Sequence, residues 1–175
     1  MNSVSTTSKI FALISLIAAS IWVGSYLTRM FLVYQLFEGT DLILKSYINE
    51  SNIQGILLSL LPAIMVHVLA FIVMIISTLL FYLTLKLSLR FNGWLFIILI
   101  AILVTFPFEI YLMLIDYKVV IALISGSFDS EQVITLLRDR IKDLSSFPIV
   151  ALLTYLSFYY FIIFKPITKK IEPKV

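Results

Sequence analysis

Four long apolar segments dominate the pattern of this sequence, and most polar residues gather between them. The apolar segments run over residues 10–37, 56–85, 94–124 and 147–164. A helix that crosses a bilayer needs about 20 predominantly apolar residues, at roughly 1.5 Å of rise for each. The pattern therefore predicts four membrane-spanning helices, of which the first three are long enough to be tilted or to extend beyond the bilayer.

The first apolar segment has some features of a signal peptide, because Lys9 precedes an apolar run that reaches Ala18, Ala19 and Ser20. The run continues well past these small residues, however. We therefore expect it to be a retained first helix.

The third connection contains a shorter helical pattern, predicted over residues 129–144. Asp129 can cap its amino terminus and Glu131 lies in the first turn, where a negative charge is favourable. Its apolar positions share one face (Val133, Leu137, Ile141 and Leu144), and its charged positions share another (Arg138, Asp139, Lys142 and Asp143). Such an amphipathic helix lies on the membrane, against a partner subunit, or as a roof over the bundle. The predicted fold is all-α: one domain over residues 1–175, an integral membrane four-helix bundle with a short amphipathic helix in its third connection.

Composition agrees with this prediction, since 61% of the 175 residues are hydrophobic and only 13% are charged. Soluble domains are about 45–50% apolar and about 25% charged, so the lipid bilayer is the expected solvent. The absence of cysteine excludes disulfides, thiolate metal sites, thiol catalysis and iron–sulfur clusters. With His67 as the single histidine, the chain can build neither a bis-histidine haem site nor a three-histidine metal centre.

The motifs of common enzymes are also missing from the sequence. No glycine-rich nucleotide-binding motif, zinc-protease motif or nucleophile-elbow motif is present. We therefore expect that this chain alone is not an enzyme and holds no cofactor. The net charge of +3 is too small to indicate binding of nucleic acid.

The distribution of basic residues predicts the orientation in the membrane, because cytoplasmic connections are enriched in Lys and Arg. With four spans, both termini and the middle connection share one side, which contains Lys9, Lys86, Arg90, Lys165, Lys169, Lys170 and Lys174. On the other side, basic residues are diluted by acidic ones, although Arg138, Arg140 and Lys142 count against the assignment. We expect a multi-pass protein of the cell membrane with both termini in the cytoplasm.

Charged residues inside the apolar segments are the candidate functional residues, because intramembrane charges usually pair with one another or serve a function. Counted from the cytoplasmic ends, Arg29, His67 and Glu109 reach a similar level near the outer boundary. Asp116 is seven residues beyond Glu109 and points the same way, so we group it with them in a buried polar cluster. Its depth favours an interfacial position for Asp116, beside Lys118.

Three interpretations of this cluster stay open. In the first, Arg29 and Glu109 form an ion pair that locks the helices together, with His67 as a third member. In the second, Glu109 and His67 carry protons or line a polar cavity. In the third, a subunit or cofactor lies against them; His67, Met65 and Met113 are weak candidates for metal ligands, and no metal is expected.

The first helix contains a small-xxx-small pair, Ser20 and Gly24, which allows another helix to approach closely. The surrounding stretch SLIAASIWVGSYLTRMF, residues 15–31, resembles the opening helix of bacterial copper-resistance D-type membrane proteins. Where that family has a histidine before the Trp, this chain has Ile17 and Ala18. We therefore assign no family from this resemblance.

Taken together, these patterns favour a small accessory or structural subunit of a larger membrane complex, such as a respiratory or redox assembly, with other membrane subunits as partners. One alternative is a small proton-coupled transporter that uses Glu109, His67 and Arg29. A second alternative is a membrane protein that handles haem or copper.

Overall fold

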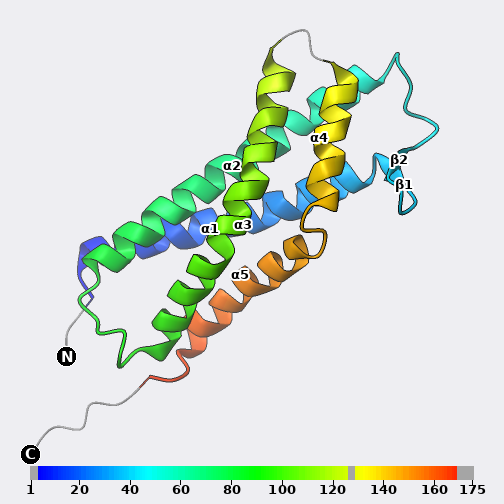
Figure 1. Cartoon of the computed structure of the whole chain (residues 1–175). Coiled ribbons are helices and arrows are strands. Elements are labelled where there is room, and N and C mark those ends of the chain that lie inside the picture. Colours follow the sequence, from blue (N-terminus) through cyan, green and yellow to red (C-terminus); the bar gives the residue numbers. More distant parts are fainter. Residues whose placement is uncertain (1–3, 126–128, 169–175) are drawn as a thin grey trace, which may run out of the picture.

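The computed structural model describes residues 4–125 and 129–168, and within them the chain is helical with one small hairpin (Figure 1). The helices are α1 (Thr6–Tyr34), α2 (Ile53–Thr84), α3 (Gly93–Ile124), α4 (Ser130–Lys142) and α5 (Phe147–Phe164). Two antiparallel strands of two residues each, β1 (Phe37–Glu38) and β2 (Ile43–Leu44), follow α1. The all-α bundle with a short helix between its last two long helices is thus confirmed.

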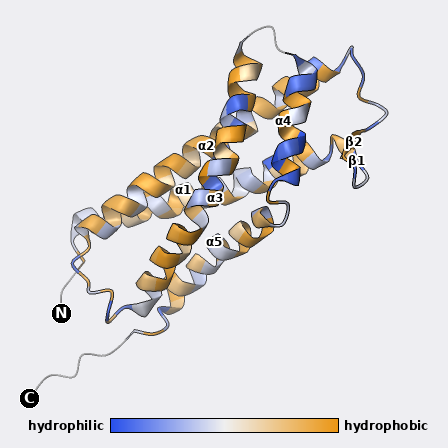
Figure 2. Cartoon of the chain, viewed as in Figure 1, coloured by the Kyte–Doolittle hydropathy of each residue, from blue (hydrophilic) through white to orange (hydrophobic). Residues whose placement is uncertain are grey.

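Helices α1, α2, α3 and α5 are long and apolar enough to cross a membrane, with 29, 32, 32 and 18 residues. Figure 2 shows them mostly in the colour of hydrophobic residues. Their large apolar side chains remain exposed on the outside of the bundle; Leu83 and Ile163, for example, are 72% and 70% exposed. A surface of this kind needs lipid rather than water around it. The protein is therefore a multi-pass integral membrane protein in contact with the bilayer.

Helices α1 and α2 form a closely packed pair along their length, whereas α3 and α5 contact this pair less extensively (Figure 1). The start of α1, the end of α5 and the connection between α2 and α3 lie at one end of the bundle. The hairpin and α4 lie at the other end, which we call the α4 end.

The first helix begins earlier than predicted, at Thr6, and ends at Tyr34 rather than at residue 37. Beyond it the chain folds into the β1–β2 hairpin, in which Gly39 adopts a positive φ of 67° that few other residues tolerate. The side chains of Leu36, Phe37 and Leu42 are then buried against the end of the bundle. The apolar run in the sequence extends past Tyr34 because these hairpin residues belong to the core, although the helix has already ended.

Helix α4 begins as the sequence predicts, with the Asp129 carboxylate accepting a hydrogen bond from the Glu131 backbone N–H at 2.9 Å. Its apolar face packs on α3 and α2, where the side chains of Val133 and Leu137 are fully buried. Of the three placements that the sequence left open, the structure thus adopts the roof over the bundle.

The interior consists of two cores. The aromatic core includes Trp22, Tyr26, Phe71, Tyr155 and Phe158. The α4-side core is mainly aliphatic and includes Leu57, Leu60, Ile64, Val119 and Leu137.

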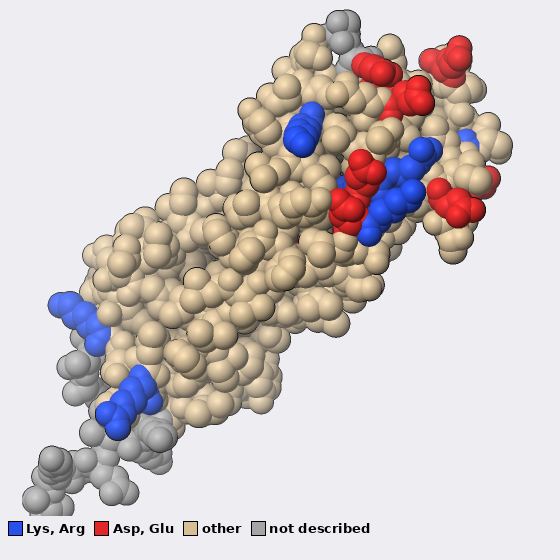
Figure 3. Space-filling view, in the orientation of Figure 1, with Lys and Arg blue, Asp and Glu red and all other residues tan. Residues whose placement is uncertain are grey.

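Charges differ between the two ends of the molecule. On the face seen in Figure 3, the charged side chains of described residues near the end where α1 begins are basic, whereas acidic and basic side chains mix at the α4 end. This pattern is the basis of the predicted cytoplasmic termini, which stays a prediction.

Candidate functional site

Asp116 of α3 connects three helices at the junction of the two cores. Its side chain is fully buried, and its Oδ1 atom accepts hydrogen bonds from Arg29 Nη1 of α1 and from Arg140 Nε of α4, the latter at 2.9 Å. Each contact is also an ion pair. One carboxylate oxygen therefore holds α1, α3 and α4 together.

Asp116 is buried, because α4 folds back over α3 and covers it. Its depth relative to the membrane interface stays a prediction. One of the open interpretations is wrong here. Arg29 does not pair with Glu109; its ion-pair partner is Asp116. Distance along a helix gives the position of a residue along the bundle, but it cannot show that another helix covers the residue.

Arg140 is a member of this site that the sequence analysis missed. It lies seven residues after Val133 and three after Leu137, and therefore on the buried face of α4. The spacing was visible in the sequence, but the residue was treated as part of a charged surface segment. Burial lowers the pKa of Arg140, whereas Asp116 and Tyr26 raise it; the net pKa is above the ordinary value, so the guanidinium stays charged.

Aromatic rings surround the two guanidinium groups and His67. The Cζ atoms of Arg29 and Arg140 lie 5.6 and 5.9 Å from the centre of the Tyr26 ring, within the range of cation–π attraction. The imidazole of His67 lies edge-on to Tyr26, with ring centres 4.9 Å apart, and is stacked 5.7 Å from Trp22. His67 is buried, and its Nδ1 atom has no hydrogen-bond partner among the residues that the structure describes.

Glu109 differs from Asp116 in its bonding, although both are on α3. Glu109 is only 1% exposed, yet neither of its carboxylate oxygens makes a hydrogen bond or an ion pair within the described part of the chain. Arg140, Arg29 and Asp116 lie within electrostatic reach of it. The predicted cluster of Arg29, His67, Glu109 and Asp116 thus lies in one neighbourhood, with Arg140 and Tyr26 in addition.

Ser20 and Gly24 were predicted to allow close approach of another helix, but none of the described helices lies against Gly24. A Cβ atom built on Gly24 would meet nothing within 4 Å, so no helix of the described chain approaches there. Ser20 is exposed, and its hydroxyl bonds to the Leu16 carbonyl oxygen and to the Tyr159 hydroxyl of α5, at 2.9 and 2.8 Å. A contact through Gly24 with a second chain stays a prediction.

The weak candidates for metal ligands do not converge. Met65 is exposed on the outside of α2, whereas His67 is buried inside the bundle and Met113 is buried on α3. Residues two apart on a helix point in nearly opposite directions, which explains the separation of Met65 from His67. Among residues 4–125 and 129–168 there is no group of three or more His, Cys, Asp or Glu side chains that could hold a metal ion.

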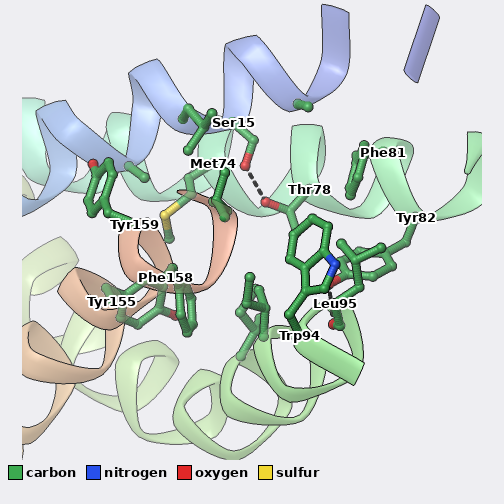
Figure 4. A pocket seen from close by; sticks show the side chains of 16 residues that line it. Ser15, Met74, Thr78, Phe81, Tyr82, Trp94, Leu95, Tyr155, Phe158 and Tyr159 are labelled. Atoms are coloured by element: carbon green, nitrogen blue, oxygen red, sulfur yellow. Dashed lines mark hydrogen bonds between the residues drawn. The ribbon is translucent and has the colours of Figure 1, made fainter. Parts of the chain in front are cut away.

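A separate apolar pocket lies in the half of the bundle away from α4. It has a volume of about 120 Å³ and is lined by residues of α1, α2, α3 and α5 (Figure 4). Ser15 and Thr78 hydrogen-bond to each other across its wall at 2.5 Å, and the Tyr82 hydroxyl donates to the Leu95 carbonyl at 2.7 Å. Most polar groups of the lining are therefore hydrogen-bonded within the protein, and the surface of the pocket is formed mainly by aromatic and aliphatic side chains.

Comparisons with protein-family models, with curated proteins and with solved structures find no match to this chain. The resemblance of residues 15–31 to copper-resistance proteins thus has no counterpart in a family match. Fold and site together define an all-α integral membrane protein with a buried charge cluster under an amphipathic roof helix.

Proposed function

We propose that the protein is a small proton-coupled membrane transporter in which Glu109 is the proton-binding group. The observation that carries this proposal is the isolation of Glu109: the carboxyl group is sealed from solvent and has no bonded partner in the described chain. A buried polar group without a partner is costly, and such groups in membrane helices are by default candidates for function.

The neighbouring carboxylate supports this assignment by contrast. Asp116 is bonded to two arginines, so a change in its protonation would break the contacts that hold α4 to the bundle. Glu109 can gain or lose a proton without the loss of any such contact. Asp116 thus carries a fixed charge, and Glu109, about two helical turns away on α3, carries a charge that can change.

Groups from four helices lie within electrostatic reach of Glu109. These groups are Tyr26 and Arg29 of α1, Asp116 of α3, Arg140 of α4 and Tyr155 of α5. A proton on Glu109 would change the balance among these groups, and in particular the field at the two arginines. This provides a physical link between proton binding and the packing of α1 and α4.

The test is proton flux into proteoliposomes that contain a pH-sensitive dye, driven by an imposed membrane potential. Wild-type protein should conduct protons, and Glu109→Gln should lose most of the flux while its unfolding temperature stays close to that of the wild type. Glu38→Gln is the matched control, because Glu38 is exposed in the hairpin. Proton flux that is unchanged in Glu109→Gln would contradict the proposal.

An accessory or structural subunit of a membrane complex is the second candidate. It is favoured by the open surface at Gly24, which no described residue of another helix approaches, beside exposed apolar residues such as Ile21. The use of the apolar face of α4 inside the chain removes one reason for expecting α4 to dock on a partner. The proposal thus depends on α1 rather than on α4, and identifying the co-purifying chains would name the complex.

The natural absence of cysteine makes this candidate straightforward to test. Gly24→Cys should crosslink to another chain in native membranes, whereas Leu103→Cys, exposed on α3, is the control for a position away from the small-residue pair. A monodisperse monomer in mild detergent, together with no crosslink from Gly24→Cys, would eliminate the accessory role.

A further inference from the structure

The apolar pocket between α1, α2, α3 and α5 lies toward the end of the bundle where α1 begins. It is lined by the first half of α1, the end of α2, the start of α3 and the end of α5, and all four segments run to that end (Figures 1 and 4). Its volume is about 120 Å³. An apolar cavity of about 150 Å³ in another protein stays dry and binds benzene. The pocket therefore has room for a short segment of hydrocarbon.

The hydroxyl groups around this pocket are already bonded. Ser15 and Thr78 bond to each other, the Tyr82 hydroxyl donates to a backbone carbonyl oxygen, and the two tyrosines of the lining on α5 bond to neighbouring hydroxyl groups. The N–H group of Trp94 has no partner among the described residues, but its nitrogen is buried and exposes almost no surface to the pocket. A polar ligand would find few free groups here, whereas hydrocarbon needs none. The lining therefore favours an apolar occupant.

The surroundings of the pocket indicate that it opens toward the bilayer between α1 and α5. The lining residues of α1 are all only partly buried, whereas those of α3 are mostly buried. The small side chains of Ala12 and Ala19 leave space in the wall, and α1 and α5 contact each other sparsely. Apolar side chains of the same turns, such as Leu13 and Ile163, are exposed on the outside of the bundle. Lipid surrounds this outside, so a lipid chain can enter the pocket from the side.

Basic residues flank this opening on both helices. Lys9 is three residues before Ala12, and Lys165 is three residues after Ile162; both lysines are exposed. Residues three apart on a helix lie on nearly the same side, so each lysine continues the face of its helix that lines the pocket by about one turn. No acidic residue occurs in α1, α2, α5 or the connection between α2 and α3. A negative group beside the two lysines would therefore meet no like charge from these segments.

We propose that the pocket binds one acyl chain of an anionic phospholipid, whose headgroup contacts Lys9 and Lys165. Lipid tails are as apolar as leucine, so entry from the bilayer gives no net hydrophobic gain. An unfilled space between helices lacks van der Waals contacts, however, and a segment of the chain restores them. The lysines attract a negative headgroup, which makes the site selective for an anionic lipid over a neutral one. This site is independent of proton binding by Glu109.

The test uses the full-length protein in bilayers of phosphatidylcholine and measures the fluorescence of its two tryptophans. A minor fraction of phosphatidylglycerol with brominated acyl chains is added, because bromine quenches tryptophan on contact and Trp94 belongs to the lining. Brominated phosphatidylcholine at the same fraction is the reference. The anionic lipid should quench more strongly and in a saturable way. Equal quenching by the two lipids would overturn the proposal.

Variants separate the pocket from the lysines. Ala12→Leu fills the pocket and should remove most of the extra quenching, whereas Lys9→Gln and Lys165→Gln should each weaken the affinity for the anionic lipid about fivefold. Lys118→Gln removes an exposed lysine from the other half of α3 and should behave as the wild type. The lysine variants change exposed positions, so they decide the question even if Ala12→Leu does not fold.

Two results would overturn the assignment. Extra quenching that is unchanged in a folded Ala12→Leu protein would mean that the lipid lies only against the outside of the bundle. An affinity for the anionic lipid that is the same in Lys9→Gln, Lys165→Gln and Lys118→Gln would mean that no headgroup is held at this end.

Discussion

The half of the bundle under α4 and the half near the start of α1 differ in how their interiors are packed and how their buried polar groups are bonded. Under α4, Asp116 binds two arginines from two other helices, and aliphatic side chains close around it. In the other half, aromatic rings dominate and a pocket of about 120 Å³ is present. Polar atoms without a partner among the described residues occur in both halves, for example Asp116 Oδ2 and Trp94 Nε1. Glu109 lies toward this second half. From this difference we expect the α4 half to be the more rigid of the two.

The largest expected effect comes from the removal of the shared counter-ion under α4. Asp116→Asn should lower the free energy of unfolding by about 3–5 kcal/mol, because two buried arginines lose their only contact partner. Chemical unfolding in bicelles would measure this loss. Asp139→Asn, at an exposed position of α4, is the control and should change stability by less than about 0.5 kcal/mol. Equal effects of the two variants would show that the ion pairs contribute nothing.

The second effect tests whether apolar packing also holds α4 in place. Leu137 is fully buried, so Leu137→Ala should destabilise the protein by about 2–5 kcal/mol. Limited proteolysis near residue 129 should become faster, since α4 would separate more often from α3. Thr135→Ala, on the exposed face of α4, should leave the rate of cleavage unchanged. Slow cleavage in Leu137→Ala would mean that the arginines alone secure the helix.

A third comparison concerns the packing density of the aromatic half. Ala151 is fully buried in the aromatic core, and Ala151→Leu should cost about 1–3 kcal/mol through overpacking. Ala12 lines the pocket, so Ala12→Leu has space to fill and should be neutral or stabilising by about 1 kcal/mol. Thermal unfolding in the same detergent measures both. A loss of stability in Ala12→Leu as large as that in Ala151→Leu would show that the pocket is not open space.

The smallest expected effect on stability is that of Glu109→Gln. Glutamine keeps the shape of the side chain, and no hydrogen bond is lost because Glu109 makes none in the described chain. We expect a change of less than about 1 kcal/mol, in contrast to Asp116→Asn. Chemical unfolding of both variants in one series would measure the contrast. A large loss of stability in Glu109→Gln would indicate a structural role and remove the basis for the proton-binding proposal.

The sequence predicts the elements of the fold well and their contacts less well. Runs of apolar residues longer than about 20 locate the spanning helices, and Asp129 marks the start of α4. The run up to Phe37 misled the prediction, because a core residue of a hairpin is as apolar as a residue of a spanning helix. The pattern of apolar residues cannot distinguish a hairpin core residue from a residue of a spanning helix, because it carries no information on which other segments pack against that residue.

The candidate site shows the same limit. Depth and helical spacing brought Arg29, His67, Glu109 and Asp116 to attention, and the structure places these residues in one neighbourhood. The choice of ionic partner depends on how α4 folds back, and that is a tertiary contact between residues far apart in the sequence. Arg140 was therefore missed, and Glu109 was assigned a partner that in fact belongs to Asp116.

The most direct test of the account is an infrared titration of the carboxyl groups, because a protonated carboxyl in apolar surroundings has a carbonyl stretch separate from that of the carboxylate. We predict a band that varies with pH in the wild type, is absent from Glu109→Gln and persists in Asp116→Asn. A band that survives in Glu109→Gln and is lost in Asp116→Asn would contradict the division between an adjustable Glu109 and a fixed Asp116.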